Sequence, residues 1–322
     1  MTPTGRIAIL RAPRSAIVNT HRARVPEPGQ VRVKLEGCGV CGSNLPVWEG
    51  RPWFVYPRDA GSPGHEGWGR VDLVGDAVDT LRAGERVAVL SYHAFADYDI
   101  AAASHLVRLP PALDGQPFPG EALGCAMNIF RRSGIESGQT VAIVGVGFIG
   151  ALLVGLATRA GARVIAISRR SFALEMARRM GAHGTIPLES NSVVVGAVRE
   201  LTGQQGCERV IEATGLQDPL DLASELVAER GRLVIAGYHQ DGLRHVNMQL
   251  WNWRGIDVVN AHERDPKIYV EGIRAAVDAV ARGELDPSPL YTDRFTLEEL
   301  PHAFARLQQR DGYFMKALLA YE

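Results

Sequence analysis

The sequence has few cysteines, four in 322 residues. That number is too small to hold a chain of this length together as a disulfide-linked scaffold. We therefore expect a reducing compartment and a cytoplasmic location. At roughly 100–200 residues per domain, the length predicts two domains. The four thiols are Cys38, Cys41, Cys125 and Cys207.

The sequence also lacks an excess of either charge. Lysine and arginine number 35 against 36 aspartates and glutamates, which gives a net charge of −1. Nucleic-acid-binding proteins show a basic excess or stripe, and proteins of anionic membrane surfaces carry polybasic segments. We therefore expect a small-molecule substrate, with no nucleic-acid and no membrane partner.

Long apolar runs are scarce as well. Residues Met1–Leu10 lack the extended apolar region of a signal peptide. One uncharged run, Val141–Ala157, approaches transmembrane length, but Gly145, Gly147 and Gly150 interrupt it. We expect a buried strand followed by a buried helix there.

Two kinds of pattern divide the chain near Pro119. Before it, alternating segments such as Gln30–Glu36 and clusters of proline and glycine predict a β-rich domain. After it, short apolar strands alternate with helices, which predicts an α/β domain with a parallel sheet. The predicted strands are Thr140–Val144, Arg163–Ser168, Arg209–Ala213, Arg232–Ala236 and Gly255–Asn260, and the predicted helices include Phe148–Ala160 and Pro219–Glu229.

A glycine-rich turn follows the first of these strands. Its sequence, Gly145-Val146-Gly147-Phe148-Ile149-Gly150, has the spacing G-x-G-x-x-G and opens a predicted helix. The three glycines permit a tight turn, a close approach of the backbone to a pyrophosphate, and close packing of helix on strand. The helix N-terminus adds free N–H groups for phosphates. A purely structural turn is the alternative, and the context favours dinucleotide binding by Gly145, Gly147, Phe148, Ile149 and Gly150.

The residues after the second strand indicate which dinucleotide binds. An acidic residue at that place would bind the ribose 2′-hydroxyl of NAD. Here the strand ends in Ser168, Arg169 and Arg170, with no carboxylate. Guanidinium groups match phosphate geometry, so we expect NADP(H) to be preferred over NAD(H). The alternative is that both arginines are solvated surface charges.

Three metal-binding side chains occur in the β-rich part. Cys41, His65 and Glu66 offer a thiolate, an imidazole and a carboxylate, which are all zinc ligands. Their spacing alone is not diagnostic, because the residues lie far apart in the sequence. A lone histidine is also more often a packed or surface residue than a ligand. Cys38 and Cys41 also form a C-x-x-C pair, for which redox chemistry is the other interpretation.

Two segments resemble the zinc-dependent medium-chain dehydrogenase/reductase superfamily, the relatives of alcohol and sorbitol dehydrogenases. Gly64-His65-Glu66-Gly67-Trp68-Gly69, followed by Gly75 and Val78, matches its GHE zinc signature, and Gly39–Asn44 resembles its G-x-C-G-[ST]-D segment. The resemblance covers essentially the whole chain. It implies an α/β fold with a GroES-like catalytic domain (1–122), a Rossmann domain with a doubly wound parallel sheet (123–262), and a C-terminal segment (263–322) that returns to the catalytic domain.

The resemblance also implies roles for particular residues. Cys41 and His65 would be ligands of one catalytic zinc ion, and Glu121, which lies 24 residues before Gly145, would be the third. Cys125 is the alternative third ligand, but it stands too close to Gly145 for the family pattern. Glu66 would be an alternate ligand or a catalytic group beside the metal, and Ser43 would hold the substrate hydroxyl and pass on its proton.

Three departures from the family pattern stand out. Asn44 replaces an aspartate that orients a ligand histidine, although an asparagine oxygen still accepts a hydrogen bond. Pro46 replaces the histidine of a proton relay, so proton release must run through water, ribose or a glutamate. The strand at Gly84–Val87 leads directly into the next strand, so the four-cysteine structural zinc lobe is missing.

The resemblance implies a zinc-dependent oxidoreductase. It would transfer a hydride between NADP(H) and an alcohol or carbonyl, and the glutamates favour a polyol, sugar or cyclitol. The alternatives are an isomerase or lyase that uses a tightly bound nicotinamide for transient oxidation, and a silent binding protein. In relatives the last Rossmann strand pairs across a two-fold axis, so Gly255–Asn260 predicts a homodimer or homotetramer.

Overall fold

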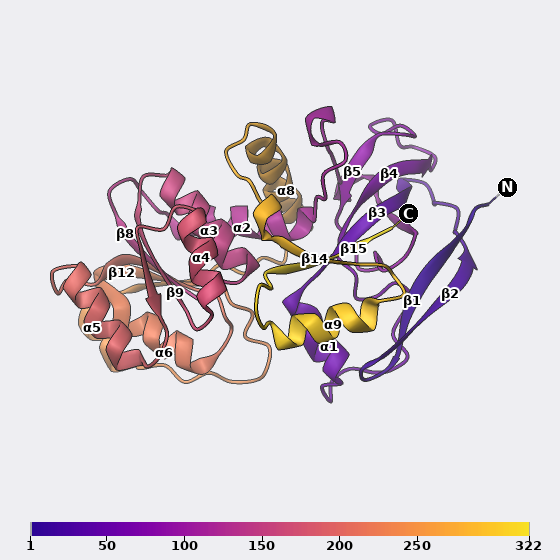
Figure 1. Ribbon diagram of the computed structural model, residues 1–322. Helices are drawn as coiled ribbons and strands as arrows, with labels where there is room; N and C mark the ends of the chain where they lie inside the picture. The colour runs from indigo at the N-terminus through magenta and orange to yellow at the C-terminus, as the bar shows by residue number, and fades with distance from the viewer. Residues whose placement is uncertain (1, 322) are drawn as a thin grey trace. The chain divides into compact units, whose positions relative to one another are not determined.

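The computed structural model describes residues 2–321 and divides into two compact units (Figure 1). The first unit contains the chain up to Gly124 and the chain from Asp265 onward, and the second unit is Cys125–Arg264. Helix α2 (Gly120–Ser133) begins in the first unit and continues into the second.

A largely antiparallel sheet of seven strands forms the first unit, in the order β14-β15-β3-β4-β5-β7, with β6 also paired to β3. Strand β15 pairs antiparallel with β3, so a late segment of the chain lies beside an early one (Figure 1). The elements are β1 (Thr4–Ala12), β2 (Ser15–Arg22), β3 (Gln30–Val40), α1 (Leu45–Glu49), β4 (Glu66–Val74), β5 (Arg86–Val89), β6 (Tyr98–Ala102), β7 (Leu106–Arg108), α8 (Pro266–Ala281), β14 (Tyr291–Phe295), α9 (Leu300–Gln309) and β15 (Lys316–Ala320).

The core of the first unit also joins early and late segments. Trp48 of α1 stacks on Phe304 of α9 with ring centroids 4.7 Å apart, and Phe95 meets Phe304 edge to face at 6.0 Å. All three rings are buried. Aromatic pairs in these geometries contribute about 0.5–1.5 kcal/mol each beyond the burial of their area. Helix α9 is thereby fixed against α1, which begins four residues after Cys41.

The second unit is a six-stranded sheet in the order β10-β9-β8-β11-β12-β13, and every pair is parallel. The strand order reverses between β8 and β11, and ligands of doubly wound sheets bind at the carboxyl ends of the strands at such a reversal. The elements are β8 (Thr140–Val144), α3 (Phe148–Arg159), β9 (Arg163–Ser168), α4 (Ser171–Arg179), β10 (Gly184–Pro187), α5 (Asn191–Leu201), β11 (Cys207–Glu212), α6 (Gln217–Leu226), β12 (Val227–Ile235), α7 (Met248–Arg254) and β13 (Asp257–Asn260).

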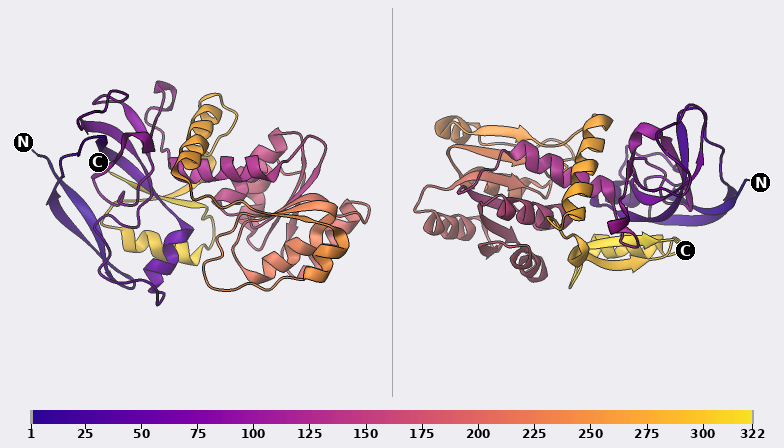
Figure 2. Two further views of the ribbon diagram at one scale, coloured as in Figure 1. Left: turned by 180° about the vertical axis from the view of Figure 1, so that it is seen from behind. Right: turned by 90° about the horizontal axis from the view of Figure 1, so that it is seen from above.

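Helices cover both faces of the sheet in the second unit (Figure 2). Helices α3 and α4 pack together, and α6 packs against both α5 and α7. Right-handed crossovers that run to opposite sides of the reversal place their helices on opposite faces of the sheet. Both faces of the apolar strands are therefore covered by helices. Four of the five residues of β8 are buried, as expected for a strand covered on both faces.

The helix predicted over Pro219–Glu229 is wrong beyond Leu226. Helix α6 ends there, and Val227 takes an extended conformation (φ −68°, ψ 130°) and pairs with Cys207 of β11. The apolar residues at this point fit either element, so the sequence pattern does not mark the change. Pairing with β11 supplies the backbone hydrogen bonds that the helix would otherwise provide.

Two further features follow the sequence-based expectation. Residues 90–97 alone connect β5 to β6, so no structural zinc lobe is inserted between these strands. No helix within residues 2–321 has the length and apolar content needed to cross a membrane.

Candidate active site

The end of strand β3 presents Cys41. The chain leaves β3 at Val40, and a single 3-10 turn over Gly42–Asn44 follows Cys41. The buried Asn44 fixes this turn, because its Oδ1 accepts a hydrogen bond from the Cys41 N–H (3.2 Å) and its Nδ2 donates to the carbonyl of Pro63 (3.1 Å). Asn44 therefore ties the Cys41 turn to the segment before His65.

His65 lies directly before β4 and is buried. Its Nδ1 donates to the Pro63 carbonyl at 2.8 Å, since a carbonyl oxygen can only accept. Its Nε2 faces Ser43 Oγ at 3.4 Å and Glu121 Oε2 at 3.9 Å. In a neutral ring, the hydrogen bond from Nδ1 to Pro63 would leave the lone pair on Nε2, which is the arrangement of a metal-ligating histidine.

The structure corrects the expectation that the Asn44 oxygen takes over the hydrogen bond with which an aspartate orients the histidine. The acceptor for the histidine N–H is the Pro63 carbonyl, while the Asn44 oxygen is used by the Cys41 N–H. The Asn44 amide nitrogen stands 3.4 Å from His65 Nδ1. A backbone carbonyl thus does the orienting that the family assigns to an aspartate.

Side chains from β3, β4 and α2 converge at this point. Within the described chain, one ligand atom each from Cys41, His65 and Glu66 lies within 4.8 Å of the others. Glu121, in the first turn of α2, approaches His65 Nε2 on the same side as Ser43. The candidate residues spread over 80 positions of sequence are therefore neighbours, while Cys125 is not in the group of three.

Glu66 is fully buried and paired with a lysine that sequence reasoning missed. Lys316 Nζ, at the start of β15, lies 2.7 Å from Glu66 Oε1 and 2.5 Å from Oε2. Gly39 leaves room for this carboxylate, because a Cβ there would stand 1.7 Å from Glu66 Oε2. Lys316 was detectable in principle, since it is the one charged residue in the otherwise apolar strand Lys316–Ala320.

Negative charge exceeds positive charge around His65. Burial lowers the pKa of His65, but the hydrogen bond and charge of Cys41 and the charges of Glu121 and Glu66 outweigh it and raise the pKa to about 10. Burial likewise opposes the charge of Lys316, yet the same three anionic groups raise its pKa. A thiolate, an imidazole and two carboxylates with surplus negative charge fit a divalent zinc ion in both ligand chemistry and charge.

The glycine turn of the second unit has the geometry that dinucleotide binding requires. Gly145 has φ +101°, and a Cβ on Gly150 would stand 2.1 Å from the Gly145 carbonyl oxygen. Gly147 caps α3, and a Cβ there would meet nothing within 4 Å. The first and third glycines are thus required by backbone conformation and packing, while a side chain on Gly147 would meet open space.

The remaining predicted cofactor residues divide by exposure. Phe148 is buried, so its N–H group rather than its ring is available to a phosphate, and Ile149 is half-buried. Arg169 is exposed just beyond β9. Arg170 reaches back to the turn and donates to the Val146 carbonyl at 3.3 Å. Its backbone N–H donates to Ser168 Oγ at 3.3 Å.

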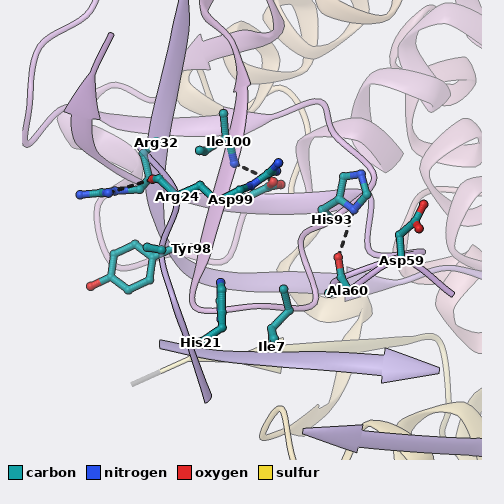
Figure 3. Close-up of a pocket in the computed structure, with 11 residues that line it drawn as sticks. Ile7, His21, Arg24, Arg32, Asp59, Ala60, His93, Tyr98, Asp99 and Ile100 are labelled. Carbon is teal, nitrogen blue, oxygen red and sulfur yellow. Dashed lines mark hydrogen bonds between the residues drawn. The ribbon is translucent and has the colours of Figure 1, made fainter. Parts of the chain in front are cut away.

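A cavity of about 400 Å³ opens elsewhere in the first unit (Figure 3). Its wall includes the β1–β2 hairpin and β6, and the His93 ring on its edge is hydrogen-bonded to the Ala60 carbonyl at 3.1 Å. None of the metal-site candidates lines it. The lining residues are Ile7, His21, Ala23, Arg24, Arg32, Asp59, Ala60, His93, Tyr98, Asp99 and Ile100.

Comparison with known proteins gives family matches to two segments of the chain and relatives that align over most of it. Residues 27–111 match the family described as alcohol dehydrogenase GroES-like domain, and residues 149–280 match zinc-binding dehydrogenase. The chain is 25% identical to 2-dehydro-3-deoxy-L-galactonate 5-dehydrogenase of Pseudoalteromonas atlantica, with 94% of each chain covered. It is 26% identical to sorbitol dehydrogenase of Gallus gallus, with 97% of this chain and 96% of the relative covered.

Solved structures agree with these matches. A zinc-binding dehydrogenase from Sinorhizobium meliloti bound to NADP superposes with a TM-score of 0.86 at 25% identity, covering 99% of this chain and 100% of that one. An oxidoreductase/dehydrogenase of unknown specificity from Escherichia coli has a TM-score of 0.90 at 21% identity, over 99% and 100% of the two chains, which shows the shared fold. The chain belongs to the zinc-dependent medium-chain dehydrogenase/reductase superfamily, with the alcohol and sorbitol dehydrogenase-like members, and is an oxidoreductase of that class.

Proposed function

We propose that this enzyme transfers a hydride between a nicotinamide dinucleotide and a secondary alcohol or ketone of a polyol, sugar or cyclitol. The observation that carries the proposal is the convergence of Cys41, His65 and Glu66 within 4.8 Å, with Glu121 beside them. Relatives named sorbitol dehydrogenase and probable D-xylulose reductase A, at 25–26% identity, support the substrate class.

Cys41, His65 and Glu121 are proposed to hold the zinc ion. Glu66 is the less suitable third ligand, because Lys316 contacts both of its oxygens. Glu66 then serves as an alternate ligand and as a buried negative charge beside the metal. Bound zinc supplies a Lewis acid that lowers the pKa of the substrate hydroxyl.

Ser43 is proposed to hold the substrate hydroxyl and to pass on its proton, giving up its own Oγ proton as it accepts that of the substrate. Its Oγ lies 3.4 Å from His65 Nε2, on the side where Glu121 also points. Ser43 is half-buried and so has access to water, whereas the buried Pro46 has no titratable group. The proton then passes from Ser43 to water, to the cofactor ribose or to a glutamate, since Pro46 cannot carry it.

The second unit is proposed to bind NADP(H) in preference to NAD(H). Gly145, Gly147 and Gly150 supply the turn, with the N–H groups of Phe148 and Ile149 at the start of α3. Bound nicotinamide supplies or accepts the hydride. Support for the phosphorylated cofactor comes from Ser168, the exposed Arg169 and Arg170 at the end of β9, and from the NADP in the Sinorhizobium meliloti structure.

We also propose that the domains divide at residues 1–122, 123–262 and 263–322, and that the protein is a cytoplasmic homodimer or homotetramer. Strand β13 is an edge strand of its sheet, and Trp253 and Met248 of the neighbouring α7 are 85% and 53% exposed. An open edge beside exposed apolar side chains favours pairing with a second copy. None of the four cysteines forms a disulfide, which supports a reducing compartment.

The test is a screen of purified enzyme with neutral polyols, sugars and cyclitols against NADP and NAD, together with zinc analysis. We expect about one zinc ion per chain and reduction of NADP by at least one polyol. Tightly bound cofactor without net turnover would instead favour an isomerase or lyase. Absence of zinc, with activity unchanged in Cys41→Ala, would refute the proposed mechanism.

A further inference from the structure

The side chain of Glu212 is fully buried at the carboxyl end of β11, where Glu212 pairs with the residue before Gly145. Its Oε1 accepts hydrogen bonds from the backbone N–H groups of Thr214 (2.6 Å) and Gly215 (3.0 Å), and from the Thr214 hydroxyl. A Cβ on Gly145 would stand 2.4 Å from Thr214 Cγ2. Glu212 therefore fixes a turn, Thr214–Gly215, that packs against the first glycine of the G-x-G-x-x-G segment.

The other oxygen of Glu212 is bound by a histidine from the segment that follows β12. Arg244 Nε donates to His239 Nδ1 at 3.0 Å, because a guanidinium has no acceptor. The proton of the neutral ring is then on Nε2, which donates to Glu212 Oε2 at 2.9 Å. His239 thus uses both ring nitrogens, and its side chain is only 14% exposed.

These hydrogen bonds close into a ring. Arg244 Nη2 donates to the Gly215 carbonyl at 3.0 Å, and the Gly215 N–H donates to Glu212. The ring therefore runs from Glu212 through His239 and Arg244 to Gly215 and back. The packing around it is close, since a Cβ on Gly237 would stand 2.5 Å from Glu212 Oε2 and 2.1 Å from the Gly215 nitrogen. The ring joins the loop after β11 to the loop after β12.

Stability alone does not account for this polar ring. Strands β11 and β12 already pair through their backbones as far as Glu212 and Ile235. Well-packed apolar residues often replace buried ionic networks without loss of stability. What the ring fixes is the loops beyond the strand ends, next to the reversal of strand order between β8 and β11. Dinucleotides bind to doubly wound sheets at that edge.

We propose that His239 and Arg244 are positioning residues of the dinucleotide site. They hold the Thr214–Gly215 turn beside Gly145 before the dinucleotide arrives, so less of its binding free energy is lost in ordering loops. The inference rests on the proposed function, in which the second unit binds a nicotinamide dinucleotide. It adds two residues that act through Glu212 and the turn rather than through the glycines themselves.

The experiment compares His239→Leu and His239→Gln with His245→Gln as control. Leucine removes both hydrogen bonds of the ring, whereas glutamine keeps one donor and one acceptor at the end of its side chain. His245 is an exposed histidine of the same segment. Calorimetry gives the Kd of NADP and of NAD, thermal unfolding gives stability, and hydrogen exchange of the Thr214 and Gly215 amides is followed in the cofactor-free protein.

We expect His239→Leu to raise the Kd of both dinucleotides about tenfold, the equivalent of one charged hydrogen bond. The amide hydrogens of Thr214 and Gly215 should exchange faster in the cofactor-free variant, because their acceptor Glu212 is no longer held by the ring. His239→Gln is expected to keep the Kd within about threefold of wild type, and His245→Gln within about twofold.

Arg244→Leu is the second variant, and it decides the test if His239→Leu does not fold. It opens the ring at the Gly215 carbonyl and leaves the contact of His239 with Glu212 in place. We expect a Kd raised about threefold or more. A Kd within twofold of wild type in Arg244→Leu and in folded His239→Leu would overturn the proposal, whatever their thermal stability.

The proposed function is tested separately, because calorimetry and hydrogen exchange need no turnover. A wild-type protein that binds NADP or NAD but oxidises no polyol would contradict the proposed function and leave the role of His239 intact. Turnover of a polyol, with unchanged dinucleotide affinity in the variants, would do the reverse.

Discussion

The two candidate sites of this chain are built in opposite ways. The glycine turn occupies six consecutive residues, Gly145–Gly150, and offers backbone N–H groups at the start of one helix. The Cys41 site takes side chains from β3, β4 and α2, and its charge balance depends on Lys316 of β15. The first is specified locally, while the second exists only after distant segments have packed.

The largest expected effect distinguishes a cysteine that binds zinc from one that does not. We expect Cys41→Ala to lose its zinc and to lower kcat/KM by more than about 100-fold, the loss that groups outside the ligand shell already cause. Cys125→Ala is the control, because this thiol on α2 lies outside the cluster of three ligand atoms. Metal analysis and rates measure both. Zinc retained at full stoichiometry in Cys41→Ala would show that the site holds no metal through this residue.

A matched pair of substitutions tests the local site. Gly147→Val adds a side chain where a Cβ meets no protein atom, so we expect unchanged thermal stability and a Kd for NADP(H) raised about 10–100-fold. Gly150→Ala places its Cβ 2.1 Å from the Gly145 carbonyl, so stability falls as well. Cofactor titration and thermal unfolding measure the pair. Equal loss of stability in both variants would mean that Gly147 is a packing residue too.

A third prediction concerns the ion pair of Lys316 with Glu66. Lys316→Met leaves the carboxylate of Glu66 buried without its cation, and we expect about 3–5 kcal/mol lower free energy of unfolding. The double variant Lys316→Met with Glu66→Gln removes the charge and is expected to recover most of that loss. Urea unfolding measures the series. Additive effects in the double variant would contradict coupling between the two residues.

The smallest expected effect concerns cofactor choice. Arg169→Ser is expected to lower the preference for NADP over NAD by about tenfold, the equivalent of one charged hydrogen bond. Arg169 is exposed, so its loss should leave stability unchanged. Arg178→Ser, an exposed arginine of α4, is the control. An unaltered ratio of the two kcat/KM values would assign the preference to Arg170 or Ser168.

The sequence predicted the family and the fold class well because the relevant signals are local. The strand at Thr140–Val144 and the turn after it were predicted from adjacent residues alone. The end of α6 was not predicted from local sequence, because Val227 begins β12 by pairing with Cys207, which lies 20 residues earlier in the chain. A short apolar segment that is buried on all sides has no polar positions to show its periodicity, so the sequence does not distinguish a helix from a strand there.

The candidate site could be predicted in part, and only through the family resemblance. Cys41, His65 and Glu66 carry the residue types of a zinc site, but their distance in sequence gave no geometric information. The Pro63 carbonyl that orients His65 cannot be recognised in a sequence, because every residue carries a backbone carbonyl. Lys316 was missed, since it contacts Glu66 from a segment 250 residues later in the chain.

The pairing of Lys316 with Glu66 also sets an order of events during synthesis. The two residues are separated by 250 positions, so Glu66 leaves the ribosome long before its cation exists. At about 5–20 residues per second, that interval lasts roughly 10–50 s. During it the Glu66 carboxylate is without its cation, so the buried ion pair of the folded chain has not yet formed. The ion pair of Glu66 with Lys316 therefore belongs to the last stage of chain folding, after β15 has been made and has paired with β3.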